Sequence, residues 1–135
     1  MSRLMIRKLA SLEVPTGWLM LFNNFVHFGE GEAPAADDYE LYLTQDILTV
    51  RQISPGAEGY FERSGALSIY LGWYPDGDPD GSYRLDLYRN GIDERIGFFE
   101  QRSTSIIRNA LNLCLSLGAH HAEDSEIMDA LGELS

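Results

Sequence analysis

The hexapeptide DGDPDG has acidic residues at a spacing close to that of a calcium-binding loop. Asp76, Asp78 and Asp80 would occupy positions 1, 3 and 5 of an EF-hand loop, with Gly81 at position 6. Position 12 requires a bidentate glutamate, but the sequence has Leu87 there, within a stretch that alternates like a strand. A proline and two Asp-Gly steps are typical of a hairpin connection. We therefore predict a structural turn without a metal ion, and weak metal capture is the alternative.

Adjacent histidines and one cysteine are the other groups with metal-binding or nucleophilic chemistry. His120 and His121 cannot easily face one metal ion together, and no further Cys/His cluster accompanies them. Cys114 lies between leucines on an apolar helical face, which favours a packed core residue over a catalytic thiol. The sequence also lacks a glycine-rich phosphate loop and a GxSxG motif. We therefore predict a protein without enzymatic activity, cofactor or metal ion.

Large aromatic side chains are numerous for a chain of this size. Tyr70 and Tyr74 alternate with leucine and isoleucine in one predicted strand, so they would lie on the sheet face opposite those apolar residues. Arg84, Asp86 and Tyr88 in the next predicted strand could lie on that same face. If a helix covers only the apolar side, the second face presents a mixture suited to an interface core with a polar rim. Packing in the core is the alternative for each ring taken singly.

Net charge is the most informative bulk property of the chain. The 21 acidic and 10 basic residues give a formal net charge of −11. Such a surface repels nucleic acid phosphates and anionic lipids and attracts basic proteins, so we expect a protein partner and no direct contact with nucleic acid or membrane. The alternative is acidity that serves solubility alone. The acidic residues concentrate in 29–50 and 118–135, which contain no Lys or Arg, with a smaller cluster at 76–80.

The elements that would position these residues belong to one domain, 1–135, as the length suggests. Segment 17–28 has aromatic content that favours a strand over a helix, although its spacing fits both. Segments 29–38 and 54–56 are predicted to be a loop and a turn, and Asn90-Gly91 predicts a hairpin turn. The predicted strands are 17–28, 39–43, 47–53, 59–62, 66–73, 82–89 and 95–101.

Two helices are predicted after the strands. The first, 103–118, has a broad apolar face, with Ser103 or Thr104 as its cap and Gly118 as its end. The second, 124–134, is acidic with an apolar stripe. We therefore predict the α+β class, a largely antiparallel β-sheet packed by a C-terminal apolar helix, with a short acidic terminal helix.

The compartment follows from cysteine usage and from the absence of targeting segments. A single cysteine forms no intramolecular disulfide, which favours a reducing environment. The first residues are a poor secretory signal, and no stretch approaches the roughly 20 apolar residues that cross a bilayer. We therefore expect a cytoplasmic protein.

Three segments together resemble the small immunity proteins of bacterial contact-dependent growth inhibition and polymorphic toxin systems. They are PTGWLMLFNNF (15–25), LGWYPDGDPDGSYRLDLYR (71–89) and FFEQRSTSIIRNALNLCL (98–115). The resemblance implies an antitoxin, a protein that binds and neutralises a cognate toxin domain in the cytoplasm of the producing cell. Toxins of this kind are often nucleases, whose basic active sites meet acidic inhibitor surfaces.

The residues predicted to contact such a partner come from the acidic clusters and from the aromatic face. They are Asp37, Asp38, Glu40, Tyr70, Tyr74, Asp76, Asp78, Asp80 and Tyr88. Immunity proteins can equally bind away from a toxin's active site. Two other functions stay open, a structural or regulatory subunit that forms oligomers through the apolar strip of 127–134, and an enzyme with an unrecognised site.

Overall fold

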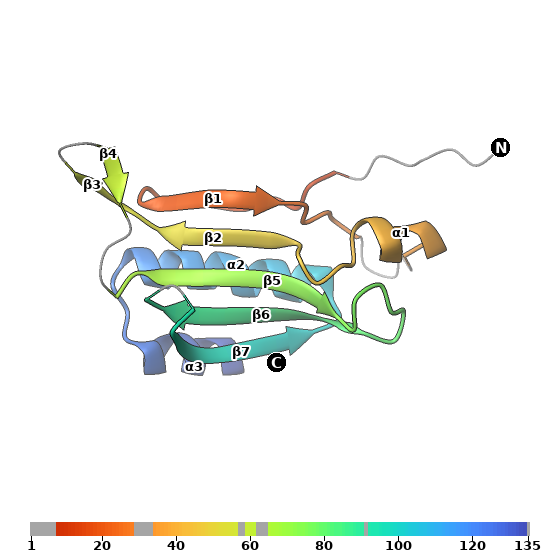
Figure 1. The fold of residues 1–135 in the computed structure, drawn as a ribbon. Coiled ribbons are helices and arrows are strands. Elements are labelled where there is room, and N and C mark those ends of the chain that lie inside the picture. The colour runs from red at the N-terminus through yellow and green to blue at the C-terminus, as the bar shows by residue number, and fades with distance from the viewer. Residues whose placement is uncertain (1–7, 29–33, 57–58, 62–64, 91, 135) are drawn as a thin grey trace.

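A computed structural model describes residues 8–28, 34–56, 59–61, 65–90 and 92–134 (Figure 1). Its main element is a five-stranded antiparallel sheet in the order β1-β2-β5-β6-β7, which is not closed into a barrel. The strands of this sheet are β1 (Trp18–Asn23), β2 (Leu48–Gln52), β5 (Leu67–Tyr74), β6 (Ser82–Arg89) and β7 (Glu94–Gln101). The other elements are the paired strands β3 (Ser54–Gly56) and β4 (Gly59–Phe61) and the helices α1 (Ala36–Leu41), α2 (Thr104–Ala119) and α3 (Asp124–Gly132). The predicted α+β class is confirmed.

The core lies between one face of the sheet and α2, with α3 against β7 (Figure 1). Every second side chain of β5 and β6 points to this face, as the alternation in the sequence predicted. The buried residues of α2 meet them from the other side, where burial of apolar area stabilises the contact. The buried residues of these three elements include Leu67, Ile69, Leu71, Trp73, Tyr83, Leu85, Leu87, Ile107, Ala110, Leu111, Cys114, Leu115 and Gly118.

Helix α2 begins where the sequence predicted and continues one residue past Gly118. The Ser103 hydroxyl oxygen accepts a hydrogen bond from the backbone N–H of Ile106 at 3.3 Å, which caps the first turn. Gly118 serves close packing and not termination, since a Cβ there would lie 2.7 Å from the Trp18 ring. The Trp18 indole N–H donates to the Leu115 carbonyl at 3.2 Å, so the start of β1 is fixed on the helix.

Helix α3 has the predicted apolar stripe, and the stripe faces inward. Ile127 and Leu131 are buried, and Met128 packs over Gly97, where a Cβ would lie 2.7 Å from the Met128 methyl carbon. The apolar strip of 127–134 is therefore occupied by packing within the chain.

Two local predictions were wrong. Segment 39–43 was expected to be a strand and 36–38 part of a loop, but α1 covers Ala36–Leu41 because the Asp38 carboxylate accepts a hydrogen bond from the Ala35 N–H at 2.7 Å and caps the helix. Segment 54–56 was expected to be a turn, but it forms β3 and pairs with β4. Within 17–28, only Trp18–Asn23 is a strand.

The Asn90-Gly91 turn is described at its first residue only. Asn90 has a φ of 53°, in the left-handed region, and its carbonyl accepts a hydrogen bond from the Asp93 N–H at 3.3 Å. Because Arg89 pairs with Glu94, residues 90–93 connect β6 and β7, which is longer than a two-residue type I′ turn. Gly91, like residues 29–33 of the predicted loop and residue 62 of the predicted strand 59–62, lies outside the described residues.

Candidate functional site

The sheet face opposite α2 and α3, here called the outer face, is covered by no helix of the described chain (Figure 1). Register and alternation place on it the three predicted tyrosines, together with Arg84 and Asp86, as the sequence predicted. Its larger side chains are Leu19, Phe22, Thr49, Arg51, Tyr70, Tyr74, Arg84, Asp86, Tyr88, Arg95, Phe98 and Glu100.

The tyrosines of the outer face are held in place by specific contacts. Tyr70 and Tyr88 pack edge to face with ring centroids 5.6 Å apart, and the Tyr70 hydroxyl accepts a hydrogen bond from the Arg51 guanidinium at 3.0 Å. The Arg84 guanidinium lies 3.9 Å from the Tyr74 ring centroid, a cation–π contact. Rings held in this way lose little further side-chain entropy when a partner covers them.

Asp86 is the buried charge that organises this face. Its side chain is only 7% exposed and accepts hydrogen bonds from Arg84 at 2.9 Å and from Arg95 at 2.6 Å. Burial alone would lower the pKa of Arg84, but the hydrogen bond and negative charge of Asp86 outweigh it and the pKa is raised. Arg84 therefore stays charged. On the described outer face arginines outnumber carboxylates, the reverse of the balance in the whole chain.

A concavity of about 310 Å³ opens on the outer face between these side chains and the segment that leads into β2. The rings of Tyr70, Tyr74 and Tyr88 line it, with Arg84 and Asp86 beside them. Aromatic and arginine side chains around a hollow are the residue types that contribute most to binding in protein interfaces.

Two acidic segments far apart in the sequence meet at one end of the sheet, where Figure 1 shows α1 beside the β5–β6 connection. The Asp76 carboxylate accepts a hydrogen bond from the Gln45 N–H at 2.8 Å, and the Gly77 N–H donates to the Leu43 carbonyl at 2.9 Å. The ring of Tyr39 in α1 also packs edge to face on Trp73, with centroids 6.1 Å apart. We call this region the acidic end; it comprises Asp37, Glu40, Asp46, Asp76, Asp78 and Asp80.

The predicted acidic residues differ in what they do there. Asp37, Glu40 and Asp80 are exposed to solvent. Asp38 is buried and caps α1, so its carboxylate has a structural role and does not face a partner. Asp78 accepts a hydrogen bond from the Asp80 N–H at 2.8 Å within the loop.

The β5–β6 connection is a fixed turn. The Trp73 indole N–H donates to the Asp78 carbonyl at 2.7 Å, and the Arg102 guanidinium donates to the carbonyls of Pro79, at 2.9 Å, and Gly81. The prediction of a structural turn is confirmed. Among the residues that the structure describes, no three His, Cys, Asp or Glu side chains are grouped to hold a metal ion.

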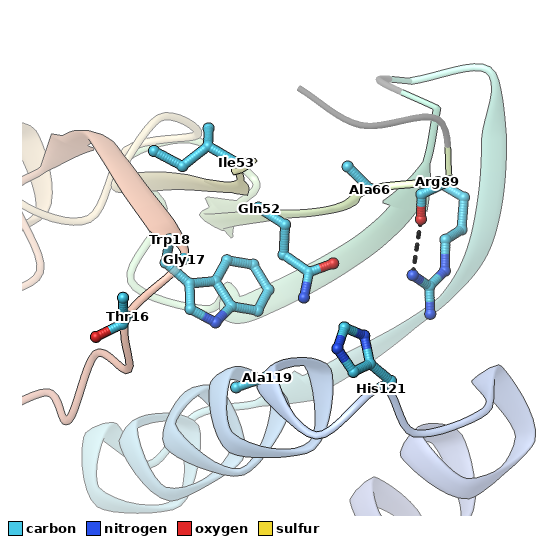
Figure 2. Close-up of a pocket in the computed structure, with 10 residues that line it drawn as sticks. Thr16, Gly17, Trp18, Gln52, Ile53, Ala66, Arg89, Ala119 and His121 are labelled. Carbon is cyan, nitrogen blue, oxygen red and sulfur yellow. Dashed lines mark hydrogen bonds between the residues drawn. The ribbon is translucent and has the colours of Figure 1, made fainter. Parts of the chain in front are cut away.

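A second concavity, of about 250 Å³, lies at the opposite end of the sheet near the end of α2 (Figure 2). Two of its polar side chains, Gln52 and Arg89, are engaged in hydrogen bonds with the surrounding chain. The Gln52 amide donates to the Gly118 carbonyl at 2.8 Å and accepts from the Leu67 N–H at 3.0 Å. Arg89 donates to the Gly65 carbonyl and to Asp124, both at 2.8 Å. These bonds tie β2, β5 and β6 to the helices and give the concavity a structural role.

Cys114, His120 and His121 lie apart from the outer face and the acidic end, and His121 lines the second concavity. Cys114 is buried in the core, and burial raises the pKa of its thiol to about 12, so the reactive thiolate is scarce at neutral pH. His120 and His121 are exposed where α2 gives way to α3, and the His120 ring nitrogen Nδ1 lies 2.8 Å from the Ser116 carbonyl oxygen. The sequence predicted a packed core residue at Cys114, and the burial of this residue in the hydrophobic core agrees with that prediction.

Sequence reasoning missed Arg51, Arg95 and Phe98 as members of the outer face. The alternation of side chains in β2 and β7 could have placed Arg51 and Phe98 on this face. The position of Arg95 could not be predicted in this way, because a bulge between Leu87 and Tyr88 shifts the register between β6 and β7. Comparison of the chain with protein-family models, with curated proteins and with solved structures found no match. In the described part of the chain, no helix has the length and apolar character to cross a membrane.

Proposed function

We propose that the protein is a cytoplasmic immunity protein, which binds and neutralises a basic cognate toxin domain, of nuclease type, in the producing bacterial cell. It acts by binding and not by catalysis. The observation that carries the proposal is the acidic end, where the Gln45–Asp76 hydrogen bond joins the segment that follows α1 to the β5–β6 turn. The likeness of segments 15–25, 71–89 and 98–115 to immunity proteins supports the same function.

The acidic end and the outer face have different roles in binding the toxin domain. A nuclease cleft is positive because it must attract phosphates, so exposed carboxylates such as Asp37, Glu40 and Asp80 steer it toward this end. The adjoining outer face supplies fixed rings and arginines as anchors once contact is made. Steering by charge makes association fast at low salt and slower as salt screens the carboxylates.

The buried apolar stripe of α3 argues against a subunit that forms oligomers through residues 127–134. That alternative requires an exposed apolar strip at 127–134, but Ile127 and Leu131 lie in the core.

The test is a binding measurement with the toxin domain encoded beside the gene for this protein. The variant Glu40→Lys/Asp80→Lys changes one exposed residue from each acidic segment, and Asp129→Lys/Glu133→Lys on the α3 side is a control with the same change in net charge. Calorimetric titration at about 0.05 M and about 0.5 M salt spans strong and weak screening.

We expect the Glu40/Asp80 variant to bind at least about tenfold more weakly, with a smaller salt dependence, and the control to bind like the native protein. Equal loss in both variants would mean that net charge and not the acidic end matters. Binding that neither variant nor salt alters would overturn the proposed site, and failure to bind the neighbouring toxin domain would overturn the function.

A further inference from the structure

Strand β1 forms one edge of the main sheet (Figure 1). Its exposed side chains are mainly apolar. Leu19 is 43% exposed, and Leu21 and Phe22 are each 49% exposed. These three residues are half of the strand, and they belong to the eight large apolar side chains that are exposed among the described residues. An exposed apolar edge strand is a site at which another strand adds to the sheet.

Charge is missing from strand β1 itself. No Asp, Glu, Lys or Arg occurs from Val14 to Phe28, in a chain with a net charge of −11. Natural edge strands are normally guarded by lysine, proline or a bulge, and of these β1 has only the register shift between Met20 and Phe22, which places Leu19 and Phe22 on the same face of the sheet. The backbone edge of β1 away from β2 pairs with no strand of the described chain, and residues 8–10 pair with residues 25–27 only beyond the end of the strand.

We propose that the β1 edge is the contact surface for a second copy of this chain, which pairs with it around a twofold axis. In this arrangement the two β1 strands run antiparallel, and Leu19 of one copy faces Phe22 of the other. The two main sheets become one continuous sheet whose helices lie on a single side, and the exposed apolar residues of both edges are covered together.

Electrostatics favours a second copy over the basic partner at this edge. A basic domain is drawn to carboxylates, which β1 lacks, whereas two copies can meet here without bringing like charges into contact. The strand ends beside α1, because the Asn24 side chain donates to the Leu41 carbonyl at 3.1 Å. Antiparallel pairing therefore puts the two acidic ends at opposite ends of the seam, roughly 20 Å apart for six residues, which exceeds two Debye lengths in physiological salt.

The experiment measures molar mass by light scattering and sedimentation over a concentration series of the full chain. The native protein should show twice the chain mass at high concentration, and its dimer should tighten as salt screens the repulsion between two acidic chains. Toxin binding should weaken with salt, so the two associations respond in opposite directions and either proposal can fail alone.

Leu19→Lys/Phe22→Lys should raise the dissociation constant of the dimer at least about tenfold, because like charges then face each other across the seam. The control Ile92→Lys places a lysine at an exposed apolar residue away from β1 and should leave the dissociation constant of the dimer unchanged. Hydrogen exchange on the native protein gives a second measurement that needs no variant, with β1 amides better protected at high concentration. A protein that stays monomeric throughout, a dimer indifferent to the β1 variant, or unchanged β1 protection would each overturn the proposal.

Discussion

Replacing Asp86 with asparagine removes the negative charge that holds two arginines on the outer face, while the size of the side chain is kept. The lost interactions are the 2.9 Å hydrogen bond from Arg84 and the 2.6 Å hydrogen bond from Arg95. Hydrogen bonds to buried charged groups contribute about 1.5–3 kcal/mol each, whereas exposed ion pairs contribute about 0–1 kcal/mol. The side chain of Arg95 is 45% exposed and that of Arg84 is 31% exposed, so both contributions lie toward the lower values.

A loss of about 2 kcal/mol of unfolding free energy follows, which corresponds to a fall in Tm of about 6–8 °C for a domain of this size. Thermal unfolding followed by circular dichroism measures this loss. The control is Asp93→Asn, the same change at an exposed residue, and its unfolding free energy should stay within about 0.5 kcal/mol of the native value. The variant should also weaken any partner that uses the outer face, since Arg84 is no longer fixed over Tyr74. An Asp86→Asn protein as stable as the control would refute the view that this carboxylate organises the face.

Gly118→Ala should destabilise the protein by about 1 kcal/mol, because steric overlap of the new Cβ with Trp18 exceeds the gain in helix propensity. Gly132→Ala, where a Cβ meets no atom within 4 Å, should have the opposite sign in the same urea titration, and equal effects would show that Trp18 does not pack so closely. Burial raises the pKa of Tyr83 from 10.0 to about 12, although the hydrogen bond with Thr104 reduces the rise. Burial also raises the pKa of Cys114 from 9.0 to about 12. As the pH rises, the unfolded chain therefore loses these two protons before the folded protein does. The stability present below about pH 9 should fall as the pH rises toward about 12. Equal denaturation midpoints at about pH 8 and about pH 11 would contradict the burial of these two groups.

The parts of the fold that the sequence predicted are those with purely local signals. The period of two in β6 and the Ser103 cap before the apolar face of α2 are each contained within a few residues, and both elements formed as expected. Helix α1 was missed because Tyr39, Leu41 and Leu43 also alternate. The interaction that favours the helix there is the hydrogen bond from the Ala35 N–H to the Asp38 carboxylate. This bond can form only after the chain has turned at Ala35, so the alternation of side chains in the sequence does not report it.

The candidate site could be predicted only in part, for a different reason. Alternation along β5 and β6 placed Tyr70, Tyr74 and Tyr88 on one face without knowledge of the tertiary structure. The meeting of the two acidic segments depends on the contact between Gln45 and Asp76, 31 residues apart, and no local pattern reports such a contact. Clustering in the sequence therefore identified these carboxylates as candidates but could not show that they lie together, or that Asp38 is turned inward.

The distribution of charge gives the two proposed surfaces different physical requirements. Carboxylates at the acidic end are exposed, so their attraction to a basic domain acts over a distance and decays with salt. The β1 edge has no charge, so contact there depends on covering Leu19, Leu21 and Phe22 and is opposed only by the repulsion between whole acidic chains. Because β1 and β7 are opposite edges of the sheet, a contact along β1 leaves the outer-face centre at Tyr70, Tyr74 and Arg84 uncovered. Self-association at the edge and capture of a toxin at the acidic end are therefore compatible in one assembly.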